Sequence, residues 1–284
     1  MRSITYRGHT LTWKEYSQGE HTLIFIHGYS ANRTIWAREV ARMARYGRCV
    51  SLDLPGHYPA SAPPGYRALC QDELLDLELR AIREIADGGR VTMVGHSTGG
   101  MVALAAAAML PEVVSRVVAI SPVVWGPLAG FLGLYQRQMR LPGGYPLYWL
   151  NYRLTQLLPG YLQWGIGSFY SGDPAAYARN PVAAAAMAAW YPDYRRSQIR
   201  NLAILLGALG KYDIRPLAAQ IACPSLVIVG TRDPVVPVVQ SRWLAQNLPC
   251  ATLLELPRSG HLPHWEAAEQ VDQEIDRWLM DCGL

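Results

Sequence analysis

The stretch Val91-Thr92-Met93-Val94-Gly95-His96-Ser97-Thr98-Gly99-Gly100 decides the fold expected for this chain. It begins as a short apolar strand pattern, passes through a G-x-S-x-G turn and enters the alanine-rich segment 98–109, which is typical of a helix that packs closely on a sheet. A serine in such a turn needs small neighbours, because the backbone bends sharply there. The stretch therefore predicts that the Ser97 hydroxyl is presented beside the first amides of a helix, where negative charge is favoured.

Apolar strand patterns alternate with helical patterns along both sides of this stretch. The alternation predicts an α/β fold with a mainly parallel central sheet and helices on both faces. An opening hairpin is expected over 3–7 and 10–16. The other strands are expected at 22–26, 49–52, 91–94, 117–120, 225–229 and 252–256, and helices at 34–46, 70–87, 98–109, 237–247 and 265–280.

The alternation stops after Ser121-Pro122 and resumes only near residue 216. We therefore predict a core domain made of 1–121 and 216–284 and an inserted helical cap at 122–215. The insertion holds 16 of the 28 aromatic residues, and nine basic residues against three acidic ones. An aromatic, weakly charged cap predicts a hydrophobic ligand, and its surplus of arginine suggests peripheral contact with an anionic membrane.

Composition excludes several other classes of protein. A net charge of +4 over 284 residues is too small to indicate a nucleic-acid partner. The five cysteines are widely spaced without a C-x-x-C pair, so neither a disulfide framework nor a zinc site is expected. The sequence contains no metalloprotease, P-loop or dinucleotide motif, so we expect no metal or cofactor. The N-terminus lacks an apolar secretory segment, which favours a cytoplasmic location, with peripheral membrane contact as an additional hypothesis.

Two further polar residues are placed where a serine nucleophile needs them. Asp233 follows the strand pattern 225–229, and His261 follows the pattern 252–256. The carboxyl ends of parallel strands share one sheet edge, so Ser97, Asp233 and His261 are expected to converge. Taken singly, Asp233 is equally typical of a helix cap and His261 of a surface loop. Together they predict a nucleophile, Ser97, a general base, His261, and an orienting acid, Asp233.

The oxyanion of an acyl-transfer reaction needs two N–H donors. Thr98 directly follows the nucleophile, and Tyr29 follows the flexible Gly28 after the strand pattern 22–26, so their backbone amides are the expected donors. We interpret His27 as a brace for this loop. His96 is expected to point away from the site, and His264 to shape the rim of the pocket.

These motifs resemble the α/β-hydrolase superfamily, and in particular its members with an inserted cap, which include esterases, lipases, C–C bond hydrolases and cofactor-free haloperoxidases. Ser97 in place of aspartate argues against the haloalkane dehalogenases and epoxide hydrolases of that superfamily. One departure is Tyr58-Pro59-Ala60-Ser61, where the family usually continues Gly-x-Ser. The resemblance rests on His27-Gly28, Asp53-Leu54-Pro55-Gly56-His57, Gly95-His96-Ser97-Thr98-Gly99-Gly100, Gly230-Thr231-Arg232-Asp233-Pro234 and Ser259-Gly260-His261.

The resemblance implies a serine hydrolase that cleaves a hydrophobic acyl ester of a small molecule or lipid through an acyl-enzyme. A C–C bond hydrolase or haloperoxidase-like enzyme on the same three residues is an alternative. A ligand-binding receptor on a hydrolase scaffold is the non-enzymatic alternative. Candidates for the wall of the substrate pocket are the cap aromatics and one histidine: Trp125, Phe131, Tyr135, Trp149, Trp164, Trp190 and His264.

Overall fold

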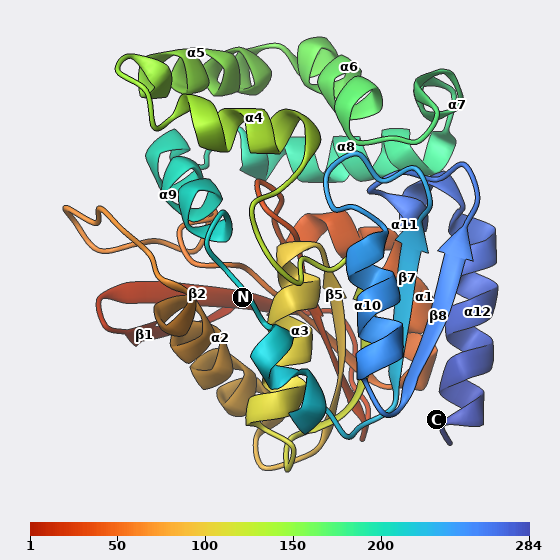
Figure 1. The fold of residues 1–284 in the computed structure, drawn as a ribbon. Helices are drawn as coiled ribbons and strands as arrows, with labels where there is room; N and C mark the ends of the chain where they lie inside the picture. Colours follow the sequence, from red (N-terminus) through yellow and green to blue (C-terminus); the bar gives the residue numbers. More distant parts are fainter.

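The computed structural model describes residues 1–284 and contains one eight-stranded sheet (Figure 1). The strand order is β1-β2-β4-β3-β5-β6-β7-β8. Strand β2 is antiparallel to both of its neighbours, β1 and β4, and all the other pairs are parallel. The predicted α/β class with a mainly parallel sheet is therefore confirmed. The strands are β1 (Arg2–Tyr6), β2 (His9–Glu15), β3 (Thr22–Ile26), β4 (Arg48–Leu52), β5 (Val91–His96), β6 (Val114–Ile120), β7 (Ser225–Gly230) and β8 (Ala251–Leu256).

Helices cover the sheet on both sides. Figure 1 shows α2 (Gln71–Ala86), α3 (Thr98–Met109) and α10 (Val239–Asn247) in front of the sheet. On the other side, Arg42 of α1 (Ala37–Met43) forms ion pairs with Asp272 and Asp276 of α12 (Ala268–Asp281). Both layers follow from the apolar strands, because a parallel sheet is stable only when both of its faces are buried.

Six helices lie between β6 and β7 in the sequence and above the carboxyl ends of the strands (Figure 1). We call α4–α9 the cap helices; the division of the chain into two domains stays a prediction. No helix of the protein combines the length and the apolarity needed to cross a bilayer. The cap helices are α4 (Gly130–Gln138), α5 (Gly144–Leu157), α6 (Pro159–Phe169), α7 (Pro174–Ala178), α8 (Pro181–Tyr194) and α9 (Ile199–Leu209).

Two predicted helices are divided in the structure. The segment predicted at 34–46 consists of η1 (Arg33–Trp36), α1 and η2 (Ala44–Tyr46). The side chain of Asn32 accepts a hydrogen bond from the Thr34 N–H at 2.9 Å and starts the first of these turns. The closing helix is preceded by a separate turn, α11 (Pro263–Glu266), because Ala267 leaves the helical conformation at φ −131° and ψ 45°.

The hydrophobic core is continuous from the sheet into the cap. Strands β3 and β5 are buried along their whole length. Leu132, Tyr148 and Leu202 of the cap helices belong to the same buried cluster as these strands. The cap helices therefore pack firmly over the sheet edge where the predicted site residues lie.

Candidate active site

Ser97 occupies the turn between β5 and α3 in a backbone conformation that an L residue rarely adopts. Its φ is 54° and its ψ is −113°. The turn is held from both sides, because the Ser97 N–H donates to the carbonyl of Ile120 at 2.9 Å and the Val123 N–H donates to the carbonyl of Ser97 at 3.2 Å. Strain of this kind persists only where surrounding structure enforces it, and it is often found at functional positions.

The glycines beside Ser97 are required by close backbone approaches. A Cβ atom on Gly99 would lie 2.1 Å from the carbonyl oxygen of Ile26. A Cβ atom on Gly95 would lie 2.2 Å from the carbonyl oxygen of Gly99. Both distances are far below van der Waals contact, so only glycine fits at these positions. The G-x-S-x-G pattern therefore follows directly from the packing of the turn.

His261 and Asp233 are joined by a buried hydrogen bond. The distance from His261 Nδ1 to Asp233 Oδ2 is 2.8 Å. The second carboxylate oxygen, Asp233 Oδ1, accepts from the N–H groups of Val235 and Val236 at 2.8 and 2.9 Å. With both oxygens engaged, the carboxylate has a fixed orientation. The His261 N–H donates to the carbonyl of Tyr170 at 2.7 Å, so a residue from the insertion also fixes the histidine backbone.

Ser97 and His261 line the same cavity, which has a volume of about 40 Å³. The Ser97 hydroxyl is not hydrogen-bonded to His261 in this structure, and such pairs are often longer in the free enzyme than in the complex. Trp190 and His264, both predicted as pocket residues, line this cavity. The other lining residues are Tyr29, Ser30, Ala31, Ile35, His96, Leu132, Ile166, Tyr170, Leu262 and Trp265.

A second cavity, of about 50 Å³, adjoins the first between the cap helices. The two cavities share Ser30, Ile166 and Tyr170. Phe131 and Trp164, both predicted as pocket residues, line the second cavity and not the one that contains Ser97. The wall of the site is therefore built in two successive chambers that lead from Ser97 toward α5 and α6.

Three predicted pocket residues line neither cavity, and this part of the prediction is wrong. Trp125 packs edge-on against Trp243 at 6.1 Å. Tyr135 is buried inside the insertion against other aromatic rings. Trp149 lies on the outer surface of α5 and is 44% exposed. Aromatic composition alone cannot distinguish a ligand wall from a cap core or from an outer surface.

The backbone candidates for an oxyanion site lie close to Ser97. Thr98 is the first residue of α3. Gly28 passes so near the turn that a Cβ atom on it would lie 3.0 Å from Ser97 Cβ. Tyr29 follows at once, and its hydroxyl forms a buried hydrogen bond of 2.6 Å with the hydroxyl of Tyr148 on α5. The loop that carries Tyr29 is thus attached to the cap.

Two buried histidines have structural contacts. His27 Nε2 accepts a hydrogen bond from the Leu54 N–H at 3.0 Å, and burial holds the pKa of His27 well below its usual value, so it is a neutral loop brace as predicted. The prediction for His96 is wrong, because this residue lines the Ser97 cavity. Its Nε2 lies 2.8 Å from the carbonyl oxygen of His261, and this hydrogen bond connects the His261 loop to the end of β5. The packing of β5 against that loop, which the sequence does not reveal, causes the difference.

Glu266 is a positioning residue that the sequence did not reveal. Its carboxylate accepts hydrogen bonds from the N–H groups of Gly172, Gly260 and Leu262 at distances of 2.8 to 3.1 Å. Burial raises the pKa of Glu266, and these three backbone donors oppose the rise. The residue ties both sides of His261 to the insertion. Only its position five residues after His261 could have indicated this, and that spacing has no general meaning.

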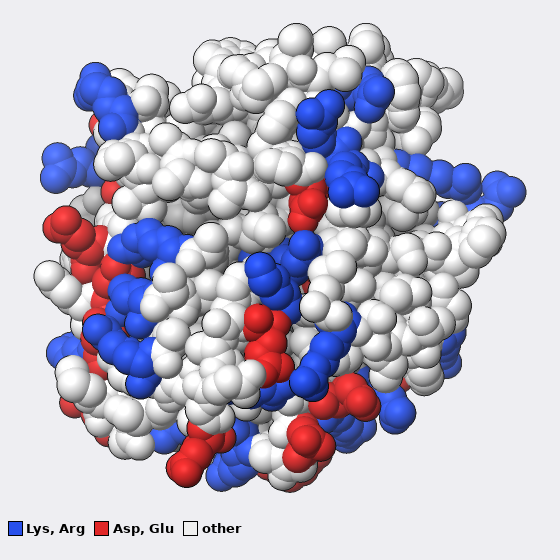
Figure 2. All heavy atoms as spheres, turned by 180° about the vertical axis from the view of Figure 1, so that it is seen from behind, with Lys and Arg blue, Asp and Glu red and all other residues white.

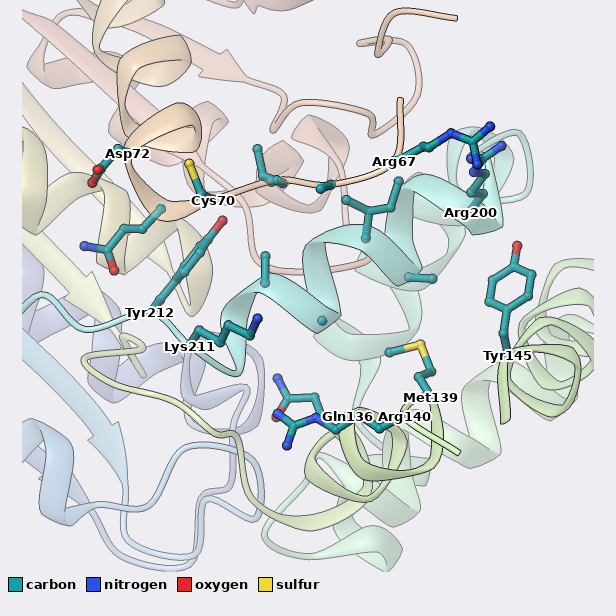
Figure 3. Close-up of a pocket in the computed structure, with 17 residues that line it drawn as sticks. Arg67, Cys70, Asp72, Gln136, Met139, Arg140, Tyr145, Arg200, Lys211 and Tyr212 are labelled. Atoms are coloured by element: carbon teal, nitrogen blue, oxygen red, sulfur yellow. The ribbon is translucent and has the colours of Figure 1, made fainter. Parts of the chain in front are cut away.

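A much larger hollow than these two cavities lies elsewhere in the protein. It has a volume of about 1060 Å³ and runs between the loop before α2 and the helices α4 and α9 (Figure 3). None of the three predicted catalytic residues lines it. No group of three or more His, Cys, Asp or Glu side chains is arranged to hold a metal ion. The groove is rimmed by four basic side chains: Arg67, Arg140, Arg200 and Lys211.

Known proteins resemble this chain over most of its length. Residues 23–274 match the model of the alpha/beta hydrolase family. The chain is 27% identical to the dihydrolipoyllysine-residue acetyltransferase component of the acetoin cleaving system of Pseudomonas putida, over 96% of this chain and 67% of that protein. It is 28% identical to the pimeloyl-[acyl-carrier protein] methyl ester esterase of Chromobacterium violaceum, over 85% of this chain and 87% of that protein.

Among solved structures, a thermophilic esterase from Thermogutta terrifontis superposes with a TM-score of 0.75 at 19% identity. The superposition covers 99% of each chain. At this identity the likeness concerns the fold alone. The family match spans most of the sequence, from β3 to α12, and includes the Ser97 turn and the loops of Asp233 and His261. The chain therefore belongs to the alpha/beta hydrolase family.

Proposed function

We propose that this protein hydrolyses a hydrophobic carboxylic ester, with Ser97 as nucleophile, His261 as general base and Asp233 as the acid that orients the histidine. The observation that carries the proposal is the 2.8 Å hydrogen bond between His261 and Asp233 beside the strained Ser97 turn. A base held by a carboxylate and facing a serine in one cavity is the arrangement that nucleophilic catalysis requires.

The steps follow from the positions of these groups. His261 Nε2 accepts the hydroxyl proton while Ser97 Oγ forms a bond to the carbonyl carbon of the ester. The negative charge that develops on the carbonyl oxygen is stabilised by the backbone N–H groups of Tyr29 and Thr98. The C–O bond to the alcohol breaks, and His261 gives its proton to that oxygen. Water then attacks the acyl-enzyme with the same proton transfers, releasing the acid and restoring Ser97.

Asp233 contributes through orientation. Its Oδ2 accepts a hydrogen bond from the Nδ1–H group of His261, which leaves Nε2 unprotonated and able to act as the base. The negative carboxylate also stabilises the imidazolium that forms during each step. The two backbone donors on Oδ1 keep the carboxylate from rotating away.

The walls of the site support a substrate with an apolar acyl or alcohol group. Leu132, Ile166 and Trp190 face the chamber that contains Ser97, and Phe131 and Trp164 continue the apolar surface in the second chamber. The chambers are small, so a long substrate requires movement of the cap helices. Ester chemistry is also supported by the relative named for the cleavage of a methyl ester.

A panel of p-nitrophenyl esters that differ in acyl chain length tests the proposal. We expect turnover by the native protein, a preference for chains longer than acetyl, and loss of turnover in a Ser97→Ala variant. The matched control is Ser30→Ala, which removes a hydroxyl from the same cavity and leaves the nucleophile in place. Undiminished turnover by Ser97→Ala would contradict the proposal. Tight retention of a ligand without turnover by the native protein would instead support a receptor.

A further inference from the structure

The outer side of α5 is apolar, although no other part of the protein covers it. The opposite side is buried and carries Tyr148 and Tyr152. A helix that rests on a core normally presents polar residues to water on its outer side. On α5 the outer side instead carries four leucines spaced three or four residues apart, each between 36% and 61% exposed: Leu147, Leu150, Leu154 and Leu157.

The apolar surface continues onto the neighbouring helices α4 and α6, through Leu134 and Trp164. Ten of the 14 exposed large hydrophobic residues of the protein lie within 134–164, on or next to α4, α5 and α6, and Figure 1 shows these three helices together at the top of the molecule. Two of them are tryptophans, Trp149 and Trp164, which are favoured at the boundary between lipid and water. We call this surface the leucine face; it consists of Leu134, Leu141, Tyr145, Leu147, Trp149, Leu150, Leu154, Leu157, Leu158 and Trp164.

The charges around the leucine face have one sign. Residues 113–172 contain no aspartate or glutamate. Three exposed arginines, Arg137, Arg140 and Arg153, lie on or beside α4 and α5. Figure 2 shows the top of the molecule, formed by the cap helices, as an uncharged surface with basic side chains around and below it. This pattern is complementary to a surface that is apolar inside and anionic at its boundary.

The leucine face also lies at the outer end of the route to Ser97. Trp164 of α6 belongs to the leucine face and lines the second cavity. That cavity shares Ile166 and Tyr170 with the chamber that contains Ser97. Once the cap helices move apart, a hydrophobic chain leaving a surface in contact with α5 and α6 would therefore reach the serine without crossing the charged flanks of the protein.

We propose that the leucine face docks the protein on an anionic lipid bilayer. The leucines enter the acyl boundary, the two tryptophans lie among the headgroups, and Arg137, Arg140 and Arg153 contact lipid phosphates. A second copy of the chain fits this surface less well. Its leucine face would bring a second set of arginines against the first with no carboxylate to pair them. An acidic protein partner also fits less well, because the centre of the surface is leucine and not arginine.

Vesicle co-flotation tests the docking, and it does not depend on the proposed ester hydrolysis. The protein carries Ser97→Ala so that no lipid can be hydrolysed through the proposed nucleophile. The vesicles are phosphatidylcholine alone, or phosphatidylcholine with about 30% phosphatidylglycerol to supply negative charge.

We expect the protein to bind the anionic vesicles, and we expect its affinity for them to fall about tenfold or more in the Leu147→Glu/Leu150→Glu variant. Arg137→Gln/Arg140→Gln/Arg153→Gln should weaken binding to anionic vesicles about tenfold or more and leave binding to neutral ones unchanged.

The matched control is Met109→Glu/Met280→Glu, which adds the same charge at exposed apolar residues far from the cap. This control should bind as the parent protein does. When Ser97 is retained, the Leu147→Glu/Leu150→Glu variant (the leucine variant) should have the same midpoint of thermal unfolding as the native protein. It should also hydrolyse a short, water-soluble ester at the same rate.

Three results would overturn the proposal. The first is no binding to anionic vesicles by the parent protein, and the second is equal binding by the leucine variant. The third is a dimer, measured by light scattering, that dissociates in the leucine variant while vesicles are not bound, which would assign the surface to a second copy. Capture of an acidic acyl carrier protein without vesicle binding would likewise assign it to a protein partner.

Discussion

The edge of the sheet at Ser97 and the cap helices above it are built by different physical constraints. Around Ser97 the backbone leaves almost no freedom, since Cβ atoms on Gly95 or Gly99 would lie within 2.2 Å of carbonyl oxygens. The cap helices are less uniform. A Cβ atom on Gly133 or Gly144 would also lie within 2.2 Å of a carbonyl oxygen, but three glycines of α6 and α9 have no atom within 4 Å of the position of a Cβ. Sterics therefore fix both glycines that flank the serine, whereas in the cap helices they fix some glycines and leave others unconstrained.

The largest difference between the two regions is expected when one carboxylate in each is replaced by an amide. We expect Asp233→Asn to lower kcat by about 10⁴-fold. The N–H groups of Val235 and Val236 would hold the amide oxygen, so the NH2 group would face Nδ1 of His261 and donate to it, which favours the wrong tautomer of the histidine. The control is Asp213→Asn, which removes an exposed carboxylate that pairs with Arg215 beside the cap helices. Its kcat should change less than about twofold. Similar losses in both variants of the purified protein would show that Asp233 has no special role.

Matched glycine substitutions test the steric part of the comparison. Gly99→Ala should destabilise the protein by more than about 4 kcal/mol or prevent folding, because the methyl group cannot occupy a position 2.1 Å from the Ile26 carbonyl. Gly207→Ala on α9 meets no atom within 4 Å and should stabilise the protein by about 0.5–1 kcal/mol through helix propensity. Urea unfolding of both variants measures these effects. A tolerated alanine at 99 would show that the turn is less constrained than the structure implies.

The difference between the two regions also explains which structural features could be predicted from the sequence. Strand patterns, the G-x-S-x-G turn and the positions of Asp233 and His261 are local features, and they predicted the sheet and the residues that meet at its edge. The chambers depend on how α4–α6 pack, so Phe131 and Trp164 were separated from Ser97, and Trp149 was misplaced. Glu266 was missed because its function is to bind three backbone amides that meet only in the folded protein.

All seven histidines lie outside 122–215, which allows a pH test of the two regions. Burial lowers the pKa of His264 to about 3, so the folded protein does not bind the proton that the unfolded chain binds near its ordinary value of 6.5. The free energy of unfolding is therefore unaffected by this residue above pH 6.5. It decreases as the pH falls from 6.5 toward 3, because only the unfolded chain binds the proton. Between pH 6.5 and 5, His264→Phe should reduce the dependence of unfolding free energy on pH by up to about 1.4 kcal/mol per pH unit. An unchanged slope would contradict this assignment.

The smallest expected effect concerns the contact between the two regions. Tyr148→Phe removes one partner of the 2.6 Å hydrogen bond to the hydroxyl of Tyr29 and leaves that hydroxyl buried without its partner. We expect a loss of about 1–2 kcal/mol in unfolding free energy. The pH slope of stability should be the same as in the native protein, because no histidine is affected. Thermal and urea unfolding at two pH values measure both quantities. They show whether the free energy of unfolding falls equally at both pH values or changes its dependence on pH.

Labelling with a fluorophosphonate probe, followed by peptide mapping, tests the central claim most directly, because it reports the nucleophile before any substrate is known. We expect one modified residue, Ser97, with labelling lost in Ser97→Ala and strongly reduced in Asp233→Asn. Labelling at a different residue, or a native, folded protein that does not react at all, would contradict it.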